Sequence, residues 1–351
     1  MLPGAGSEMM SRPASPAHTC HRWLAWSLLA IAVACSLSRL PTDPLLPAAP
    51  PEVPDPVDPA AWGADHVGEP VPEYMTGDEC LFCHRKKVGP SWSKNSHQTS
   101  LQLVPKGDPG LKQMAASPKT QKVVEAIQFI LGGDLHSRYL RRSSAYGKLD
   151  LLSVGWKVGG PLVDVEKPRW DLVQFGKGCA GCHTTGVDSK KHTFSATSID
   201  CYACHGQVQL GHTNNTKLVH LSRKRADSPQ VVASICGQCH VRGGLSRSTG
   251  LPFANNFIAG DNLFRDMKVD LSQQHIDQLN PADRHVMQNI REIVLEGKKD
   301  VTCLSCHDVH DQSSEQHQEL AEQKLCFVCH NRTGPRSELK PYSVHSTTCG
   351  Y

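Results

Sequence analysis

A five-residue pattern, Cys-x-x-Cys-His, occurs six times in this chain and constrains its fold more than any other feature. The chain has 15 cysteines and 19 histidines among 351 residues, so random placement would produce about 0.03 copies of the pattern. The copies begin at Cys80, Cys179, Cys201, Cys236, Cys303 and Cys326. A pattern repeated so far beyond chance indicates a chemical role for its cysteines and histidines.

The spacing matches the chemistry of covalent haem attachment. Two cysteines separated by two residues can add to the two vinyl groups of one haem, and the adjacent histidine can bind the iron. The predicted attachment residues are Cys80, Cys83, Cys179, Cys182, Cys201, Cys204, Cys236, Cys239, Cys303, Cys306, Cys326 and Cys329. The predicted proximal iron ligands are His84, His183, His205, His240, His307 and His330. Zinc sites would not require the histidine, and a redox dithiol would occur once. The sequence therefore predicts six c-type haems.

Further histidines can supply the second, distal ligand of each iron. The favoured candidates are His97, His136, His212, His285, His310 and His345. His285 lies on a predicted helix that begins at Asn280 and Pro281 and stops before Gly297. Less favoured are His192 and His317 in polar stretches, with His66, His220 and His275 in reserve. Two imidazoles saturate an iron, which then passes electrons but has no open position for a substrate.

The first forty residues are predicted to be a signal peptide or an N-terminal anchor. Residues Trp23 to Leu37 form a nearly unbroken apolar stretch, a length that suits a signal-peptide core and is short for a spanning helix. Either cleavage after Ala34 releases the protein, or Cys35 is lipidated as in a bacterial lipoprotein. Both alternatives predict an exported, periplasmic protein, and anchoring or lipidation would attach it to the membrane.

Residues 41–72 contain ten prolines, which favour an extended tether, although an unstructured N-terminus without a spacing role fits equally well. We expect residues 73–351 to form the haem-bearing body. Within it, 100–175 is predicted to be a haem-free, β-rich insert, 176–245 a three-haem segment and 280–351 a C-terminal two-haem segment. In the insert, Arg138–Arg142 and Leu149–Val154 predict a hairpin, and Val123–Leu131 fits a strand or a short helix.

The predicted fold class is that of a multihaem cytochrome c, with mainly short α-helices and coil wrapped around covalently bound haems and a small β-rich insert. Hydrophobic residues make up 39% and aromatic residues 6%, so we expect the porphyrins to replace side chains in much of the core. The motif spacing predicts two local haem pairs, at Cys179 with Cys201 and at Cys303 with Cys326, linked by the haem at Cys236.

Five stretches of the chain resemble a known family. They are Tyr74–His97, Cys179–Gly186, Cys201–His212, Cys236–Gly243 and Cys303–His310. They are similar to exported multihaem c-type cytochromes of the cytochrome c-554 type, and the C-terminal part resembles cytochromes with doubled Cys-x-x-Cys-His motifs. The resemblance implies distal ligation by His97, His212 and His310, and by His136 as a further match. The tetrahaem relatives have four haems and usually Pro-Gly where this chain has Gln207-Val208, so the resemblance does not carry over the haem order.

These features predict an electron-transfer protein that relays electrons between respiratory redox partners outside the cytoplasm. The expected partners are other cytochromes or membrane quinol-oxidising complexes. The alternative is a multihaem oxidoreductase that acts on a small nitrogen or sulfur compound at one five-coordinate haem, and a third hypothesis is a conducting polymer of stacked subunits. Homo-oligomers are compatible with the sequence, whereas a net charge of +3 gives no reason to expect nucleic-acid binding.

Overall fold

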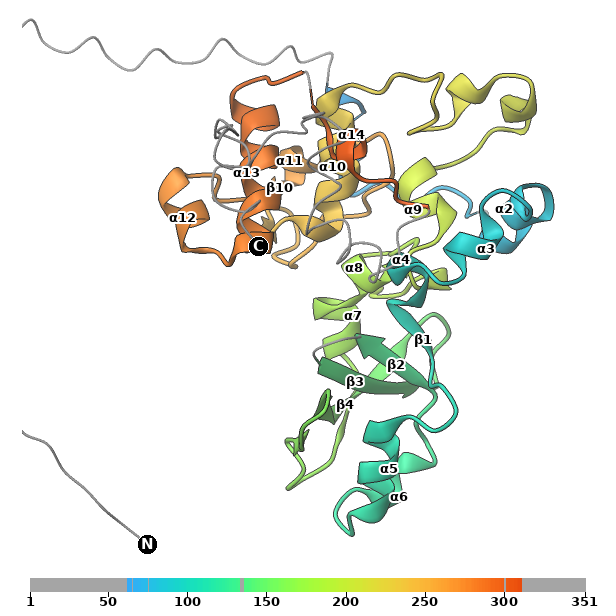
Figure 1. Ribbon diagram of the computed structural model, residues 1–351, viewed down its shortest axis with the longest axis vertical. Helices are drawn as coiled ribbons and strands as arrows, with labels where there is room; N and C mark the ends of the chain where they lie inside the picture. Colours follow the sequence, from blue (N-terminus) through green and yellow to red (C-terminus); the bar gives the residue numbers. More distant parts are fainter. Residues whose placement is uncertain (1–61, 65, 75, 133–135, 300, 311–351) are drawn as a thin grey trace, which may run out of the picture. The chain divides into compact units, whose positions relative to one another are not determined.

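Short helices and one antiparallel sheet make up the described part of the chain, which in this computed structural model comprises residues 62–310 apart from 65, 75, 133–135 and 300 (Figure 1). The predictions for the signal segment, for Cys35, for most of the proline-rich stretch, for the motif Cys326–His330 and for His345 lie outside these residues. None of the described helices has the length and apolar character needed to cross a membrane.

The helices before residue 240 are α2 (Gly77–His84), α3 (Gly89–Trp92), α4 (Ser96–Thr99), α5 (Pro109–Ala116), α6 (Gln121–Val124), α7 (Gln174–Gly178), α8 (Ala180–His183), α9 (Cys201–His205), the 3-10 helices η2 (Leu210–Thr213) and η3 (Thr216–Leu218), and α10 (Pro229–His240). Those after it are α11 (Leu263–Asp266), α12 (Gln273–Gln278), α13 (Pro281–Leu295) and α14 (Cys303–Cys306). Most have one or two turns, too short to be stable without tertiary contacts or attached groups.

The main sheet has the strand order β1-β2-β3-β4-β5, with β6 paired to β4, and every pairing is antiparallel. Its strands are β1 (Leu101–Leu103), β2 (Phe129–Gly132), β3 (His136–Arg142), β4 (Leu149–Lys157), β5 (Leu162–Val163) and β6 (Trp170–Asp171). The smaller strands β7 (Thr184–Thr185) and β8 (Ala196–Thr197) pair with each other, as do β9 (Leu245–Ser246) and β10 (Met267–Lys268).

The hairpin predicted on either side of Ser143–Lys148 is confirmed. Strands β3 and β4 pair with Leu140 opposite Leu151 and Arg142 opposite Leu149. Gly147 in the connecting turn has φ of 70°, a conformation that glycine adopts without strain. The stretch Val123–Leu131, expected to be a strand or a helix, contains both the end of α6 and the start of β2.

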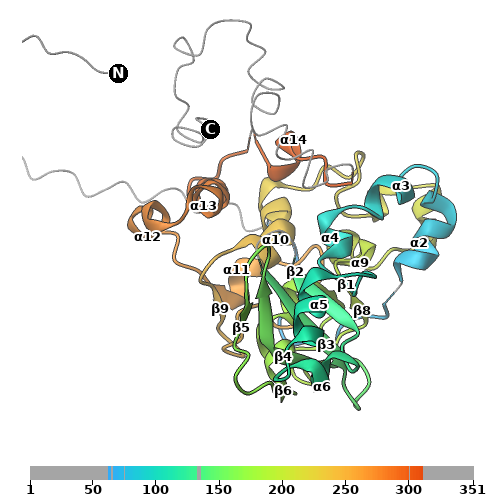
Figure 2. The ribbon, with the colours of Figure 1, turned by 60° about the horizontal axis from the view of Figure 1, so that its bottom comes forward.

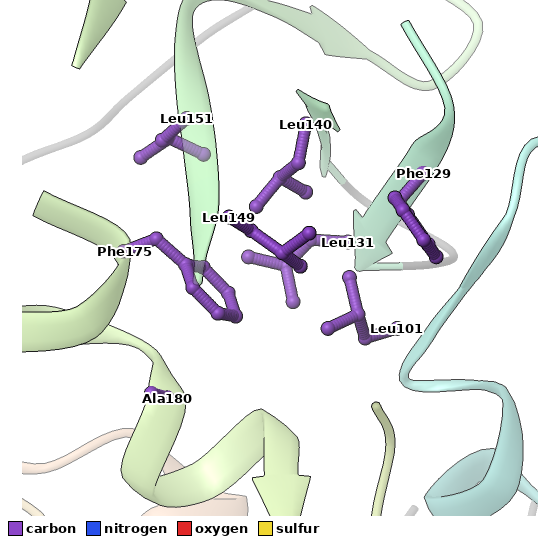
Figure 3. Close-up of a cluster of buried hydrophobic side chains, with 8 residues drawn as sticks. All are labelled: Leu101, Phe129, Leu131, Leu140, Leu149, Leu151, Phe175 and Ala180. Carbon is purple, nitrogen blue, oxygen red and sulfur yellow. The ribbon is translucent and has the colours of Figure 1, made fainter. Parts of the chain in front are cut away.

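The sheet buries an apolar cluster on each face, because successive strand residues point to opposite sides. On one face, α5 and α6 cover a cluster that includes Tyr139, Leu152 and Trp156 (Figure 2). On the other face, Phe175 of α7 points toward the leucines of the sheet, and Ala180 of α8 joins the same cluster (Figure 3). The sheet lies within the stretch 100–175, where the sequence predicts a haem-free, β-rich insert, and apolar side chains pack on both of its faces.

Two longer helices organise the second half of the described chain. Ser228 caps α10, whose last turn contains the fourth motif. Asn280 caps α13 by accepting a hydrogen bond from the Asp283 backbone N–H at 3.0 Å, and the helix ends at Leu295 before Gly297, which confirms the predicted boundaries. The two helices pack against each other, and α10 also contacts α8, α9, α11 and α14 (Figure 1).

The C-terminal end of the proline-rich stretch packs against the body. Ala64 forms a parallel bridge with Asp261, and the Trp62 ring lies edge-on to Phe264 at 5.7 Å. The Asn256 side chain donates a hydrogen bond to the Glu69 carbonyl at 2.7 Å. The sequence predicts that the folded body starts at residue 73. The structure shows it starting earlier, because residues 62–69 contact the segment at 255–264.

Candidate haem centre

The first five motifs each lie on, or at the end of, a short helix. They occupy α2, α8, α9, α10 and α14, and all of these except α14 end at the motif histidine. Residues i, i+3 and i+4 of a helix share one face. In α2, this geometry places Cys80, Cys83 and His84 on the same side, where two thioethers and an iron bond to one haem can form.

Thiols from different motifs contact one another. The Cys80 thiol of the first motif lies close enough to the Cys201 thiol of the third to help lower its own pKa and raise that of Cys201. Cys182 of the second motif meets Cys239 of the fourth, and each thiol also lies 3.7–3.8 Å from a backbone carbonyl of the other motif. The Cys236 thiol of the fourth motif lies close enough to the Cys303 thiol of the fifth that each shifts the pKa of the other, raising that of Cys236 and lowering that of Cys303.

These contacts do not follow the order of the motifs in the sequence. The motifs at Cys179 and Cys201, predicted to pair locally, form sulfur contacts with the motifs at Cys236 and Cys80. The chain between these two motifs also folds back on itself, because β7 pairs with β8 and the Asp200 N–H donates to Thr185 Oγ1 at 2.8 Å. The predicted central position of the Cys236 motif agrees with the structure, since α10 contacts the helices of the second, third and fifth motifs. Tertiary packing therefore gives these motifs further neighbours that sequence distance does not indicate.

Two predicted distal ligands lie next to predicted proximal ligands. The His97 and His240 rings are 6.1 Å apart between centres, and the His205 and His310 rings are 5.9 Å apart. Metal–imidazole bonds are about 2 Å long, and a ring centre lies about 1 Å beyond its nitrogen, so an iron between two imidazoles separates their centres by about 6 Å. Both pairs fit this requirement, and the side chains present therefore fit a haem iron at each position.

Hydrogen bonds orient two of these four rings. The His205 Nδ1–H donates to the carbonyl of His220 at 2.6 Å, and the His97 Nδ1–H donates to Asn95 Oδ1 at 3.1 Å. A ring that donates from Nδ1 keeps the Nε2 lone pair available for a metal. Both contacts therefore select the tautomer that can bind an iron.

The surrounding protein also favours the neutral imidazole. Burial lowers the pKa of His97, His183 and His205. Desolvation, together with His97 and Arg242, lowers the pKa of His240 to about 4. Only the neutral ring has a lone pair for the metal, so at neutral pH these side chains are in the form that binds iron.

The other predicted ligands lie in different settings. His136 is exposed at the start of β3, opposite Lys157 in the sheet, and His212 in η2 donates from Nδ1 to the Gln209 carbonyl at 2.9 Å. His285 lies on α13, with its Nδ1 3.4 Å from Asn289 Nδ2. In the part of the chain that the structure describes, His97 and His310 make ring contacts with proximal histidines, whereas His136 and His212 do not.

Asp200 joins the first and third motifs, a role that the sequence analysis missed. Its carboxylate accepts hydrogen bonds from the Gly77 N–H at 2.8 Å, from the Cys201 N–H at 2.5 Å and from the Tyr74 hydroxyl. A Cβ on Gly77 would lie 2.0 Å from Asp200 Oδ1, so only glycine allows this approach. The available signal was the position of an aspartate directly before a motif helix, where it acts as an N-cap.

His220, held only in reserve as a ligand, supports His205 through its backbone. Its ring Nδ1–H donates to Asp227 Oδ1 at 3.0 Å while its carbonyl accepts from the His205 ring. No pattern in the sequence indicates this contact, because it depends on the path of the loop between η3 and α10.

Comparisons with known proteins agree with this chemistry. Residues 166–206 match the family cytochrome c554 and c-prime, and residues 294–335 match the doubled CXXCH motif family. No curated protein matches the chain. A solved undecaheme cytochrome from the S-layer of Carboxydothermus ferrireducens is similar over 79% of this chain at 15% identity, with a TM-score of 0.41. The match spans 44% of that structure's length. With these two family segments and its repeated Cys-x-x-Cys-His motifs, the chain belongs to the multihaem c-type cytochromes.

Proposed function

We propose that this cytochrome carries six covalently attached haems, one per motif, and relays single electrons between redox partners outside the cytoplasm. The observation that carries the proposal is that His97 lies next to His240, and His205 next to His310, at the spacing of two iron ligands. An iron held by two imidazoles has no open position for a substrate and exchanges electrons with little change in geometry.

The contacts between motif helices support a relay rather than isolated centres. The second, third and fifth motif helices all pack against α10. The thiols of the second and fourth motifs each lie 3.7–3.8 Å from a backbone carbonyl of the other motif, so these two attachment sites are direct neighbours. When bound, the haems would supply the redox chemistry, and the chain would hold them close together and orient their ligands.

The proposed partners are other cytochromes or membrane quinol-oxidising complexes, and the proposed location is the periplasm, free or attached to the membrane through the N-terminus. The apolar segment Trp23–Leu37 supports export. Export in turn suits c-type haem, which is attached after the polypeptide has left the cytoplasm.

Replacing His310 tests the proposal directly. We expect His310→Ala to convert one low-spin iron to high spin in the electron paramagnetic resonance (EPR) spectrum of the oxidised protein, with the haem count by intact mass unchanged at six. His310→Met should keep that iron low-spin and raise its reduction potential, because a methionine–histidine pair raises the potential of a haem.

His192→Ala is the matched control, since this histidine makes no ring contact with a proximal ligand in the described part of the chain. An unchanged spectrum in His310→Ala would contradict the ligand assignment. A high-spin iron already present in the unmodified protein would instead favour the alternative, an oxidoreductase with one five-coordinate haem.

A further inference from the structure

The segment that carries His97 also reaches the segment that carries His310. Trp92 is 7% exposed, and its ring stacks on His97 at 6.3 Å with an interplanar angle of 12°. The same ring meets His310 edge-on at 6.0 Å. Trp92 is itself fixed, because its Nε1–H donates to Gln98 Oε1 at 3.0 Å. One buried aromatic ring thus touches the distal ligand candidates of two different haems.

Asn95 makes the polar part of this connection. It is 2% exposed, and its Oδ1 accepts hydrogen bonds from the His97 backbone N–H at 2.9 Å and from the ring Nδ1–H at 3.1 Å. Its Nδ2 donates to the carbonyl of Val309, the residue before His310, at 2.6 Å. A carbonyl only accepts and a backbone N–H only donates, so the partners at both ends of the amide determine its orientation.

We infer that Asn95 is a positioning residue shared by two haem irons. Through Oδ1 it selects the His97 tautomer that binds the iron opposite His240, and through Nδ2 it places His310 at the iron opposite His205. The inference rests on the proposed function, because it requires His97 and His310 to be distal ligands. It adds that one side chain sets the ligation of both irons.

The chemistry of the amide explains why asparagine is suited to this position. Aspartate would keep the acceptor for His97 but lose the donor to Val309, and serine would be too short to reach either the His97 ring or Val309. Asn95 also caps the short helix α4, and both aspartate and serine preserve that role. The two substitutions therefore separate helix capping from ligand positioning.

The test measures EPR spectra and the reduction potentials of the individual haems in the full-length, haem-loaded protein. His97→Ala and His310→Ala first identify the two low-spin signals, since each variant should convert one of them to high spin. In Asn95→Ser we expect both of these signals to shift and the others to keep their positions. In Asn95→Asp the iron of His97 should move to a lower potential, because a carboxylate acceptor makes the imidazole more basic. The signal of the His310 iron should shift in this variant as well.

Asn214→Ala, at an exposed loop asparagine, should leave every signal in place. If His97→Ala and His310→Ala each produce a high-spin iron while Asn95→Ser leaves both signals unchanged, the inference about Asn95 is wrong and the proposed function stands. A shift of the His97 signal alone in Asn95→Ser would overturn the claim that the residue serves two irons. If His97→Ala and His310→Ala leave all irons low-spin, the ligand assignment of the proposed function is wrong.

Discussion

Inside the second motif, Gly181 allows a large neighbouring side chain to reach the helix of that motif. A Cβ at this position would lie 2.1 Å from Cγ of Phe253, which is 3% exposed. Contacts this short cannot be relieved by a small rotation, because the Phe253 Cβ is also within 2.4 Å. The identity of one residue between the two cysteines is thus set by packing rather than by haem chemistry.

Gly181→Ala should therefore destabilise the protein by about 1–3 kcal/mol, the usual cost of adding a carbon to a packed interior. Thermal unfolding followed by circular dichroism would measure the loss. Gly178→Ala is the matched control, since a Cβ there meets only the flexible end of Gln174 at 3.1 Å. Equal stability of the two variants would show that Phe253 moves aside without cost.

At the scale of elements, the loop between η3 and α10 supports the third motif. Asp227 accepts hydrogen bonds from the His220 ring, from the Leu221 N–H at 2.7 Å and from Arg225 Nε at 2.8 Å. The His220 carbonyl in turn orients His205. The carboxylate thereby connects the fold of a loop to the orientation of His205, a predicted iron ligand.

This arrangement predicts a pH dependence of stability. Burial alone would raise the pKa of Asp227, but the hydrogen bonds from His220, Leu221 and Arg225 outweigh it, so the pKa is lowered. A lowered pKa means that the folded state favours the ionised form, so the stabilisation is complete above the ordinary carboxyl pKa of about 4. This stabilisation is lost as the pH falls through the lowered pKa of Asp227 in the folded state.

Denaturant unfolding of the wild type and of Asp227→Asn between pH 3 and 7 would measure this effect. We expect the wild type to be more stable near neutral pH and the difference to shrink at acidic pH. A difference that is constant across the range would contradict the assignment, because the asparagine side chain does not titrate.

On the scale of the whole molecule, helix α10 is the point where motifs distant in sequence meet. The first and third motifs contact each other through Cys80 and Cys201, and the second and fourth do so through Cys182 and Cys239. The helix of the third motif also packs against α10. These contacts connect the five described motifs into one network, with a branch at the Cys236 motif.

Removing the haem of the first motif tests this network. In the double variant Cys80→Ala, Cys83→Ala, we expect the intact mass to fall by one haem. The low-spin signal of the iron between His205 and His310 should become narrower, because closely spaced paramagnetic irons broaden each other's EPR signals. The EPR signal of this iron is assigned beforehand as the low-spin signal that disappears in His310→Ala. An unchanged line shape would mean that the first and third haems are not neighbours.

Much of the local structure was predictable from the sequence. The predicted fold class included short helices, and the capping pattern at Asn280 and Pro281 predicted α13. The β3–β4 hairpin followed from its turn and its flanking apolar residues. The sheet lies within the predicted insert 100–175, but its strand order and its two apolar clusters were not predicted, because β6 pairs with β4 rather than with β5, its neighbour in sequence.

The sequence by itself determined the covalent chemistry, since the thiols and the proximal histidine of one haem lie within five residues and share one helical turn. It also supplied His97 and His310 as candidates, but not their partners. Only the tertiary structure decided that His97 lies next to His240, that Asn95 reaches Val309 across 214 residues, and that the motifs meet out of order. The physical reason is that haem attachment needs only residues that are close in sequence. The second ligand of an iron, and the residues that orient this ligand, come from other segments that tertiary packing brings to the motif.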